Sequence, residues 1–252
     1  MVFIRSVTLW KAVSDLSRKN LFFSLIALLS VLSYFCVHSP LWPAAAADAP
    51  LPEEKLIALT FDDGPSSVST PVLLDGLAER GVHATFFLVG SMAADNHALV
   101  RRMAAEGHQI GLHTYDHSLA QGLTGLTESQ FRAQVDTTRD LLTALTGQTS
   151  FVFRPPYGFV DDSVRLWADA PIILWSVDTE DWRDQNADHI ARHIIDHAED
   201  GAIVLLHDIF STSVEGALKA IDTLLAQGYH FVTVDELFAS KGIHLLDGEV
   251  YR

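Results

Sequence analysis

The stretch LIALTFDDGP at residues 56–65 places a short apolar run directly before two adjacent carboxylates and a turn. Working outward along the chain, six further short runs are rich in β-branched and aromatic residues, and longer amphipathic stretches separate them. Strands that alternate with helices in this way are typical of β/α units. The strands are predicted at Leu56–Phe61, Ala84–Val89, His108–Leu112, Phe151–Arg154, Ile172–Val177, Ala202–His207 and Phe231–Val234.

Two of the stretches between the predicted strands carry clear helix boundaries. The first helix is predicted over Glu128–Thr146, because Thr127 and Gln130 have the spacing of a capping box and Gly147 is a typical stop. The second is predicted over Val214–Gln227, which also ends before a glycine. These boundaries support helices between the strands.

The number of units limits the architecture. Seven β/α units in about 190 residues either close into a small, irregular barrel or open into a doubly wound sheet. Unusual polar residues cluster after the first, third, fourth, fifth and sixth predicted strands, which would gather them at one face. We therefore predict an α/β fold, a distorted (β/α) barrel with about seven strands and an active site at the C-terminal face. Residues 55–240 form the predicted domain, 48–54 a short linker and 241–252 a tail.

The composition is that of a globular protein with a strong acidic excess. Of its 252 residues, 48% are apolar and 19% are charged, which suffices for a full-sized core. The formal net charge of −15 argues against nucleic acid as a partner, because binding phosphates requires clustered Lys and Arg. Strongly anionic polymers are disfavoured as substrates for the same reason.

The first 47 residues have the features of an export segment. An uncharged apolar run covers Leu21–Val37, and the small residues Ala44–Ala47 resemble an Ala-x-Ala cleavage site. We favour a cleaved signal peptide; the alternative is an uncleaved signal anchor, since about 17 to 20 apolar residues can span a bilayer. The single cysteine, Cys36, lies in this run, so the exported part has no internal disulfide. The basic residues before the run are Arg5, Lys11, Arg18 and Lys19.

Export places the domain in the periplasm, outside the cell, or at the outer side of the cytoplasmic membrane. Contact with the membrane is expected only through the N-terminal segment, if that segment is not cleaved. The oligomeric state does not follow from the sequence.

Asp62 and Asp63 end the first predicted strand. Adjacent residues on an extended segment point in different directions, so one carboxylate could bind a metal while the other stays free as a base. The alternative is a structural Asx turn formed by the sequence Asp-Gly-Pro.

His113 and His117 follow the third predicted strand, four residues apart. On one helical turn their imidazoles face the same way, which would let both bind a single ion and leave room for a carboxylate. The alternative is a pair of surface histidines on a loop.

Two further strand ends carry ionisable residues. Arg154 precedes two prolines that stiffen the following loop, so its guanidinium could orient a carboxylate such as Asp62, or simply cap the strand end. His207 follows an apolar strand, where a carboxylate partner could hold it charged as a general acid. A lone histidine at such a place is also often a satisfied core residue.

In order and spacing these segments resemble the signature of polysaccharide deacetylases with a NodB-type homology domain, a family of carbohydrate esterases. The resemblance covers nearly all of residues 55–240. It implies a distorted (β/α) barrel and the metal-dependent hydrolysis of N-acetyl groups from oligo- or polysaccharides that contain acetylglucosamine, with release of acetate. It also implies one divalent metal ion, for which zinc is the first choice and cobalt, nickel or iron are possible.

The resemblance assigns roles to individual residues. It gives a metal site, a base with its orienting cation, an acid with its tuning carboxylate, and groups that bind the acetyl group. The metal ligands are Asp63, His113 and His117; Asp62 is the base, oriented by Arg154; His207 is the acid, tuned by Asp181; Trp182 and Leu205 hold the acetyl methyl group; and Tyr157 lends its backbone N–H to the oxyanion.

Other interpretations remain open at this point. His189, His193 and His197 recur every four residues and could bind a metal, but the acidic and basic residues among them favour a solvated helix face. An aspartyl phosphatase, an iron oxygenase with two histidines and one carboxylate, and a sugar-binding module without turnover are the rival classes. Neither the glycan nor the native metal follows from the sequence.

Overall fold

A computed structural model describes residues 54–118 and 122–252. The predicted export segment, with Cys36 and the alanines before residue 48, lies outside these residues. Within the described part, no helix combines the length and the hydropathy needed to cross a membrane. The helices and strands are β1 Lys55–Asp62, α2 Thr70–Arg80, β2 Thr85–Leu88, α3 Gly90–Asp95, α4 His97–Ala105, β3 Gln109–Leu112, α5 Glu128–Thr146, the 3-10 turn η1 Pro156–Gly158, α6 Asp162–Trp167, β4 Ile172–Ile173, β5 Val177–Asp178, α7 Ala187–Asp196, β6 Ala202–His207, α8 Ser211–Ala226, β7 Tyr229–Phe231, α9 Val234–Ser240 and β8 Val250–Tyr251.

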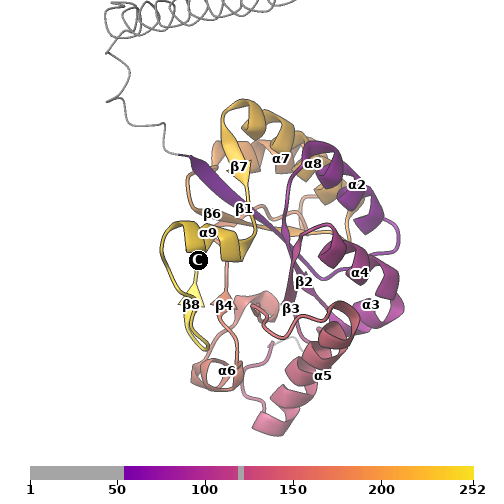
Figure 1. Cartoon of the computed structure of the whole chain (residues 1–252), viewed down its shortest axis with the longest axis vertical. Coiled ribbons are helices and arrows are strands. Elements are labelled where there is room, and N and C mark those ends of the chain that lie inside the picture. Colours follow the sequence, from indigo (N-terminus) through magenta and orange to yellow (C-terminus); the bar gives the residue numbers. More distant parts are fainter. Residues whose placement is uncertain (1–53, 119–121) are drawn as a thin grey trace, which may run out of the picture. The chain divides into compact units, whose positions relative to one another are not determined.

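The central sheet is parallel throughout and has the strand order β3-β2-β1-β6-β5. Strand β1 lies at its centre and also pairs with β7 through its first residues, Lys55–Ile57. The short strand β4 pairs with β8. Figure 1 shows the strands in the middle of the domain with the helices around them. Because the strands are parallel, their C-terminal ends meet at one face, as the sequence predicted.

Single bridges continue the ring beyond the regular strands. Phe153 bridges Leu112 at the end of β3 on one side and Ile172 in β4 on the other. Three residues separate β4 from β5, and β5 pairs with β6. The predicted distorted (β/α) barrel is therefore confirmed. Its distortion is greatest where single bridges replace a ladder.

The alternation of side chains along β1 separates two cores. Ile57, Leu59 and Phe61 point outward into the large cluster beneath the helices, whereas Ala58 points into a smaller cluster inside the barrel. Helix α9 covers the N-terminal end of the barrel, where the Val234 N–H donates to the first residue of β2. This leaves the C-terminal end for function. The inner cluster contains Ala58, Phe87, Val152, Ile173, Ile203, Val234 and Leu237.

The helix boundaries were predicted well where the signal was local. Helix α5 spans Glu128–Thr146, with both hydrogen bonds of the capping box present and Gly147 in the left-handed conformation. Helix α8 begins at Ser211 rather than Val214, because the chain turns into the helix directly after the loop that follows β6.

Three strand predictions need correction. In Phe151–Arg154 only Phe153 forms bridges, because the prolines that follow Arg154 have no N–H to extend a ladder. The run Ile172–Val177 divides into β4 and β5, because its two halves pair with different neighbours. Val234 begins helix α9 instead of ending a strand, because the Thr233 side chain caps that helix.

Candidate active site

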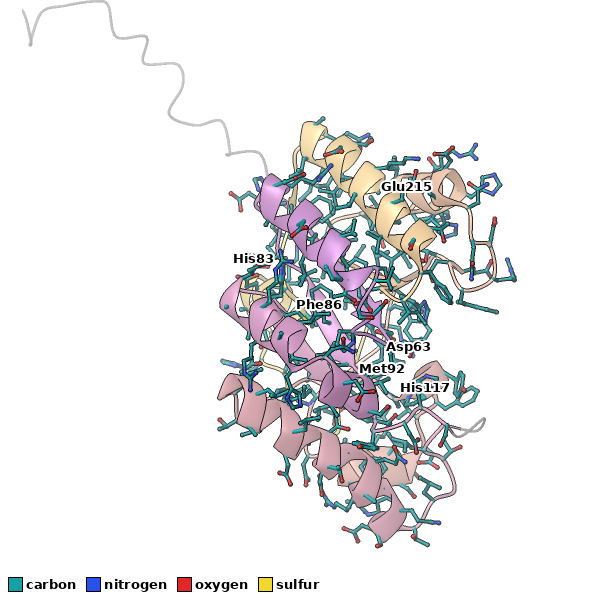
Figure 2. All side chains as sticks on the ribbon, turned by 90° about the vertical axis from the view of Figure 1, so that its right-hand side faces the viewer. Asp63, His83, Phe86, Met92, His117 and Glu215 are labelled. Atoms are coloured by element: carbon teal, nitrogen blue, oxygen red, sulfur yellow. The ribbon has the colours of Figure 1, made fainter. Side chains whose placement is uncertain are left out.

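A pocket of about 510 Å³ opens at the C-terminal face of the barrel. Eight of the ten predicted site residues line it, and the other two, Arg154 and Asp181, are fully buried. Figure 2 shows Asp63 and His117 together on the side of the domain opposite His83. The lining residues are Asp62, Asp63, His113, His117, Tyr157, Trp175, Asp178, Trp182, Leu205 and His207.

Asp63, His113 and His117 bring their ligand atoms within 4.8 Å of one another. Oδ1 of Asp63 lies 3.3 Å from Nε2 of His113 and 3.5 Å from Nε2 of His117. This oxygen is buried and has no hydrogen-bond partner among the described residues. One carboxylate and two imidazoles are a suitable ligand set for a divalent transition metal. The three residues therefore fit a metal ion.

The ionisation of Asp63 suits a metal. Burial raises the pKa of Asp63, but the nearby imidazoles of His113, His117 and His207 outweigh it and lower the pKa to about 2. Asp63 is thus a carboxylate at neutral pH. Nδ1 of His113 lies 2.7 Å from the Arg154 carbonyl oxygen, so Nδ1 donates and Nε2 is the nitrogen that faces Asp63. Burial lowers the pKa of His113, but the charges of Asp62 and Asp63 outweigh it and raise the pKa, and it is in the neutral ring that Nε2 offers a lone pair to a metal.

The backbone between His113 and His117 differs from the predicted helical turn. Thr114 and His117 have φ values of 65° and 51°, so the segment is an irregular loop. The rings still converge, with their centroids 5.0 Å apart. Gln134 in α5 stabilises the loop by accepting the backbone N–H of Tyr115 at 3.0 Å. The predicted pair therefore converges, but not through a helical turn.

Left-handed backbone at residues other than glycine is concentrated in the loops of this site. Six such residues occur in the described ranges, and only Asp169 lies away from these loops. Conformations of this kind cost of order 1–3 kcal/mol each and persist where the surrounding structure enforces them. Their concentration here is typical of a functional site. The other five are Asp63, Thr114, His117, Tyr157 and Glu180.

Asp62 is fixed by the buried guanidinium of Arg154. Nη1 of Arg154 donates to Oδ1 of Asp62 at 2.8 Å and to Oγ1 of Thr60 at 2.7 Å. Its other donors reach the backbone carbonyls of Ile173 and Leu174, both at 2.9 Å. Oδ2 of Asp62 has no such hydrogen bond and lies 3.8 Å from Nε2 of His113. One oxygen of Asp62 is therefore held, and the other is available to the pocket.

His207 lies across from Asp62 in the register of β1 and β6. Its Nδ1 is 2.7 Å from Oδ1 of the buried Asp181, and its backbone N–H donates to Oδ2 of the same carboxylate at 2.8 Å. Burial lowers the pKa of His207, but the hydrogen bond and charge of Asp181 and the charges of Asp62 and Asp63 outweigh it and raise the pKa to about 9. The surroundings of His207 thus favour its protonated form at neutral pH.

Sequence reasoning gave no role to three residues that belong to this site. Trp175 and Asp178 line the pocket. Asp208 is fully buried, accepts a hydrogen bond from the Thr70 hydroxyl and packs directly against Gly64. Burial raises the pKa of Asp208 to about 7. For Asp208 the sequence did contain a signal, namely a carboxylate directly after His207 at the end of an apolar strand.

Gly64→Ala is expected to destabilise the fold by about 1–3 kcal/mol through overpacking and to reduce metal binding. A methyl group at this position would overlap the carboxylate of Asp208, so the loop that carries Asp63 must move. Thermal unfolding and the metal content of the purified variant measure the two effects. Adding Asp208→Ala should recover part of the loss. An unchanged unfolding midpoint with full metal content would show that the contact does not matter.

The alternative metal site on α7 is not formed. His189 is held by Asp184, with Nδ1 and Oδ2 2.9 Å apart. His193 and His197 stack on each other with ring centroids 4.2 Å apart. Across residues 54–118 and 122–252, the triad of Asp63, His113 and His117 is the one group of His, Cys, Asp or Glu side chains spaced to hold an ion.

The fold and the pocket together define an α/β barrel with a candidate metal centre. A family model described as polysaccharide deacetylase matches residues 50–170. The peptidoglycan-N-acetylglucosamine deacetylase PgdA of Listeria monocytogenes is 45% identical over 187 residues, which cover 74% of this chain and 40% of that protein. This chain thus spans less than half the length of that relative.

Two solved structures match over nearly their whole length. The peptidoglycan deacetylase PdaC of Bacillus subtilis has 38% identity and a TM-score of 0.73, with 77% of this chain and 94% of that chain covered. A family 4 acetyl xylan esterase of Clostridium thermocellum in complex with a cobalt ion has 34% identity and a TM-score of 0.73, with 78% and 98% covered. The chain belongs to the polysaccharide deacetylase family.

Proposed function

We propose that this protein is a metal-dependent hydrolase that removes N-acetyl groups from glycans containing acetylglucosamine and releases acetate. The observation that carries the proposal is the pair formed by Asp62 and His207. Both face the pocket beside the metal ligands without belonging to that set, and each is held by a buried ionic partner. A module that only binds sugar has no use for a base and an acid placed in this way.

The base side of the reaction uses Asp62. A divalent cation held by Asp63, His113 and His117 supplies Lewis acidity at the acetyl carbonyl and makes a water molecule more acidic. Asp62 accepts the proton of the attacking water through Oδ2, while the hydrogen bond from Arg154 to Oδ1 keeps the carboxylate oriented. The water oxygen forms a bond to the acetyl carbon. The backbone N–H of Tyr157 is proposed to stabilise the negative charge on the carbonyl oxygen.

The acid side uses His207. The amine is a poor leaving group, so the C–N bond breaks as Nε2 of His207 gives a proton to nitrogen, and the products are acetate and the free amine. Asp181 holds Nδ1 of the same ring and so directs the other nitrogen to the pocket. Leu205 and Trp182 provide apolar surface for the acetyl methyl group.

The glycan substrate, the metal ion and the cellular location are also proposals. The names of the relatives point to peptidoglycan as the first glycan to test, followed by acetylated xylan and chitin oligomers. Zinc is the proposed metal, although a set of one aspartate and two histidines also accepts cobalt, nickel or iron. We propose that residues 1–47 export the domain that starts near residue 55.

The decisive experiment measures acetate released from these glycans with and without a chelator. We expect release from at least one glycan, its loss after chelation, and its return when zinc or cobalt is added. Metal analysis of the purified protein would identify the ion. Release that continues after the metal has been removed would overturn the mechanism, and no release from any acetylated glycan by the metal-loaded protein would overturn the function.

A further inference from the structure

Exposed aromatic side chains gather at the pocket. Among the large hydrophobic residues that are exposed in the described ranges, the aromatic ones are Tyr157 at 49%, Phe159 at 47% and Trp182 at 54%. Tyr157 and Trp182 line the pocket itself. Large apolar side chains left in water around a pocket often mark a binding surface. Phe159 has no role in the mechanism, so its exposure needs another reason.

The rings of His117, Tyr157 and Phe159 are successive neighbours, and the Tyr157 and Phe159 planes are tilted by 41° to each other. The Tyr157 ring centroid lies 4.9 Å from that of His117, and the Phe159 centroid lies 5.7 Å from that of Tyr157. A ligand that extends out of the pocket on this side therefore passes over Phe159.

The backbone that carries these two rings is closely packed. Gly158 has a φ of 68°, and a Cβ atom there would lie 2.8 Å from the Trp175 ring, so only glycine allows this approach. On the other side, a Cβ atom at Gly122 would lie 3.5 Å from the Phe159 ring. The two rings are thus placed before a ligand arrives, which reduces the entropy lost on binding.

We infer that Tyr157 and Phe159 form a second sugar subsite, which stacks on the pyranose ring next to the unit that is deacetylated. The inference rests on the proposed function, because it needs an N-acetylated glycan in the pocket. A pyranose presents an apolar face of C–H groups with hydroxyls around its edge, and the face of an exposed aromatic ring matches it. The enzyme would then act on chains rather than on single sugars.

The test compares acetylglucosamine and its oligomers of two to five units with wild type and Phe159→Ala. For wild type, kcat/KM should be higher for the oligomers than for the single sugar. For the variant, it should fall about 10-fold on the pentamer, mainly through KM, which is the scale of losing one stacking ring. It should change less than about 2-fold on acetylglucosamine itself, which is too short to reach the subsite. Phe159→Tyr should keep the length dependence.

Leu166→Ala is the matched control, because Leu166 is also an exposed apolar residue, at 73%, and lies on α6. It should leave all rates unchanged. An equal loss in Phe159→Ala on acetylglucosamine and on the oligomers, or no loss on any of them, would overturn the subsite. Acetate release from the shortest oligomer would still support the proposed function in either case.

A binding measurement tests the subsite without turnover. Titration of the metal-loaded protein with the acetylglucosamine pentamer should give a Kd about 10-fold higher for Phe159→Ala than for wild type. Equal dissociation constants would overturn the subsite even if no glycan were hydrolysed.

Discussion

Asp62→Asn is expected to lower the rate of acetate release by about 100- to 10,000-fold, the usual contribution of a general base. The amide has the shape of the carboxylate and can still accept the Arg154 hydrogen bond, which is 2.8 Å long in the native protein, but it cannot take a proton from water. The ligand set does not include Asp62. The variant should therefore lose activity and keep its metal. Acetate assays and metal analysis on the same preparation measure both.

A matched control for this variant exists at the surface. Asp222→Asn also removes a carboxylate from an arginine partner, Arg80, whose Nε lies 2.7 Å away. It should leave acetate release unchanged. If Asp62→Asn retained full activity with its metal in place, Asp62 could not be the base. If Asp62→Asn lost the metal, its lower activity would be explained by the loss of the ion and not by the loss of the base.

His207→Ala is expected to cause a loss of similar size, about 100- to 10,000-fold, because the departing amine would have no proton donor. The metal ligands are again untouched, so metal content should not change. His189→Ala is the control, since it also removes a histidine bound to an aspartate, Asp184, but on the outside of α7. Full activity in His207→Ala would remove the acid from the mechanism.

The pH profile gives an independent test of the acid. The folded pKa of His207 is about 9 against an ordinary value of 6.5, so its protonated form persists to higher pH. The contribution of this charge to stability is complete below about pH 6.5 and is lost as the pH rises through about 9. A cation bound nearby opposes protonation of His207 and so lowers its pKa. The alkaline limb of the kcat profile, where His207 loses its proton, is therefore expected at or below pH 9. Asp181→Asn should move that limb to lower pH, and an unmoved limb would contradict the assignment.

Local patterns explain the parts of the fold that were predicted from the sequence. Helix α5 has the predicted boundaries because a capping box and a terminal glycine act within a few residues. Strand β1 was also recognisable, since it is an apolar run before two carboxylates, and it is buried on both faces. The segment with Phe153 was harder to predict, because its place in the barrel depends on single bridges to two distant neighbours.

The sequence by itself determined the alternation of strands and helices, the set of ionisable residues at strand ends and the family they resemble. Only the tertiary structure decided which of these groups meet. Arg154 holds Asp62 from 92 residues away, and Asp208 contacts Thr70 across 138 residues. Such contacts depend on closing the barrel, which brings the ends of parallel strands together whatever their separation along the chain. That is also why the loop from His113 to His117 is shaped by α5 and the barrel rim rather than by helical spacing.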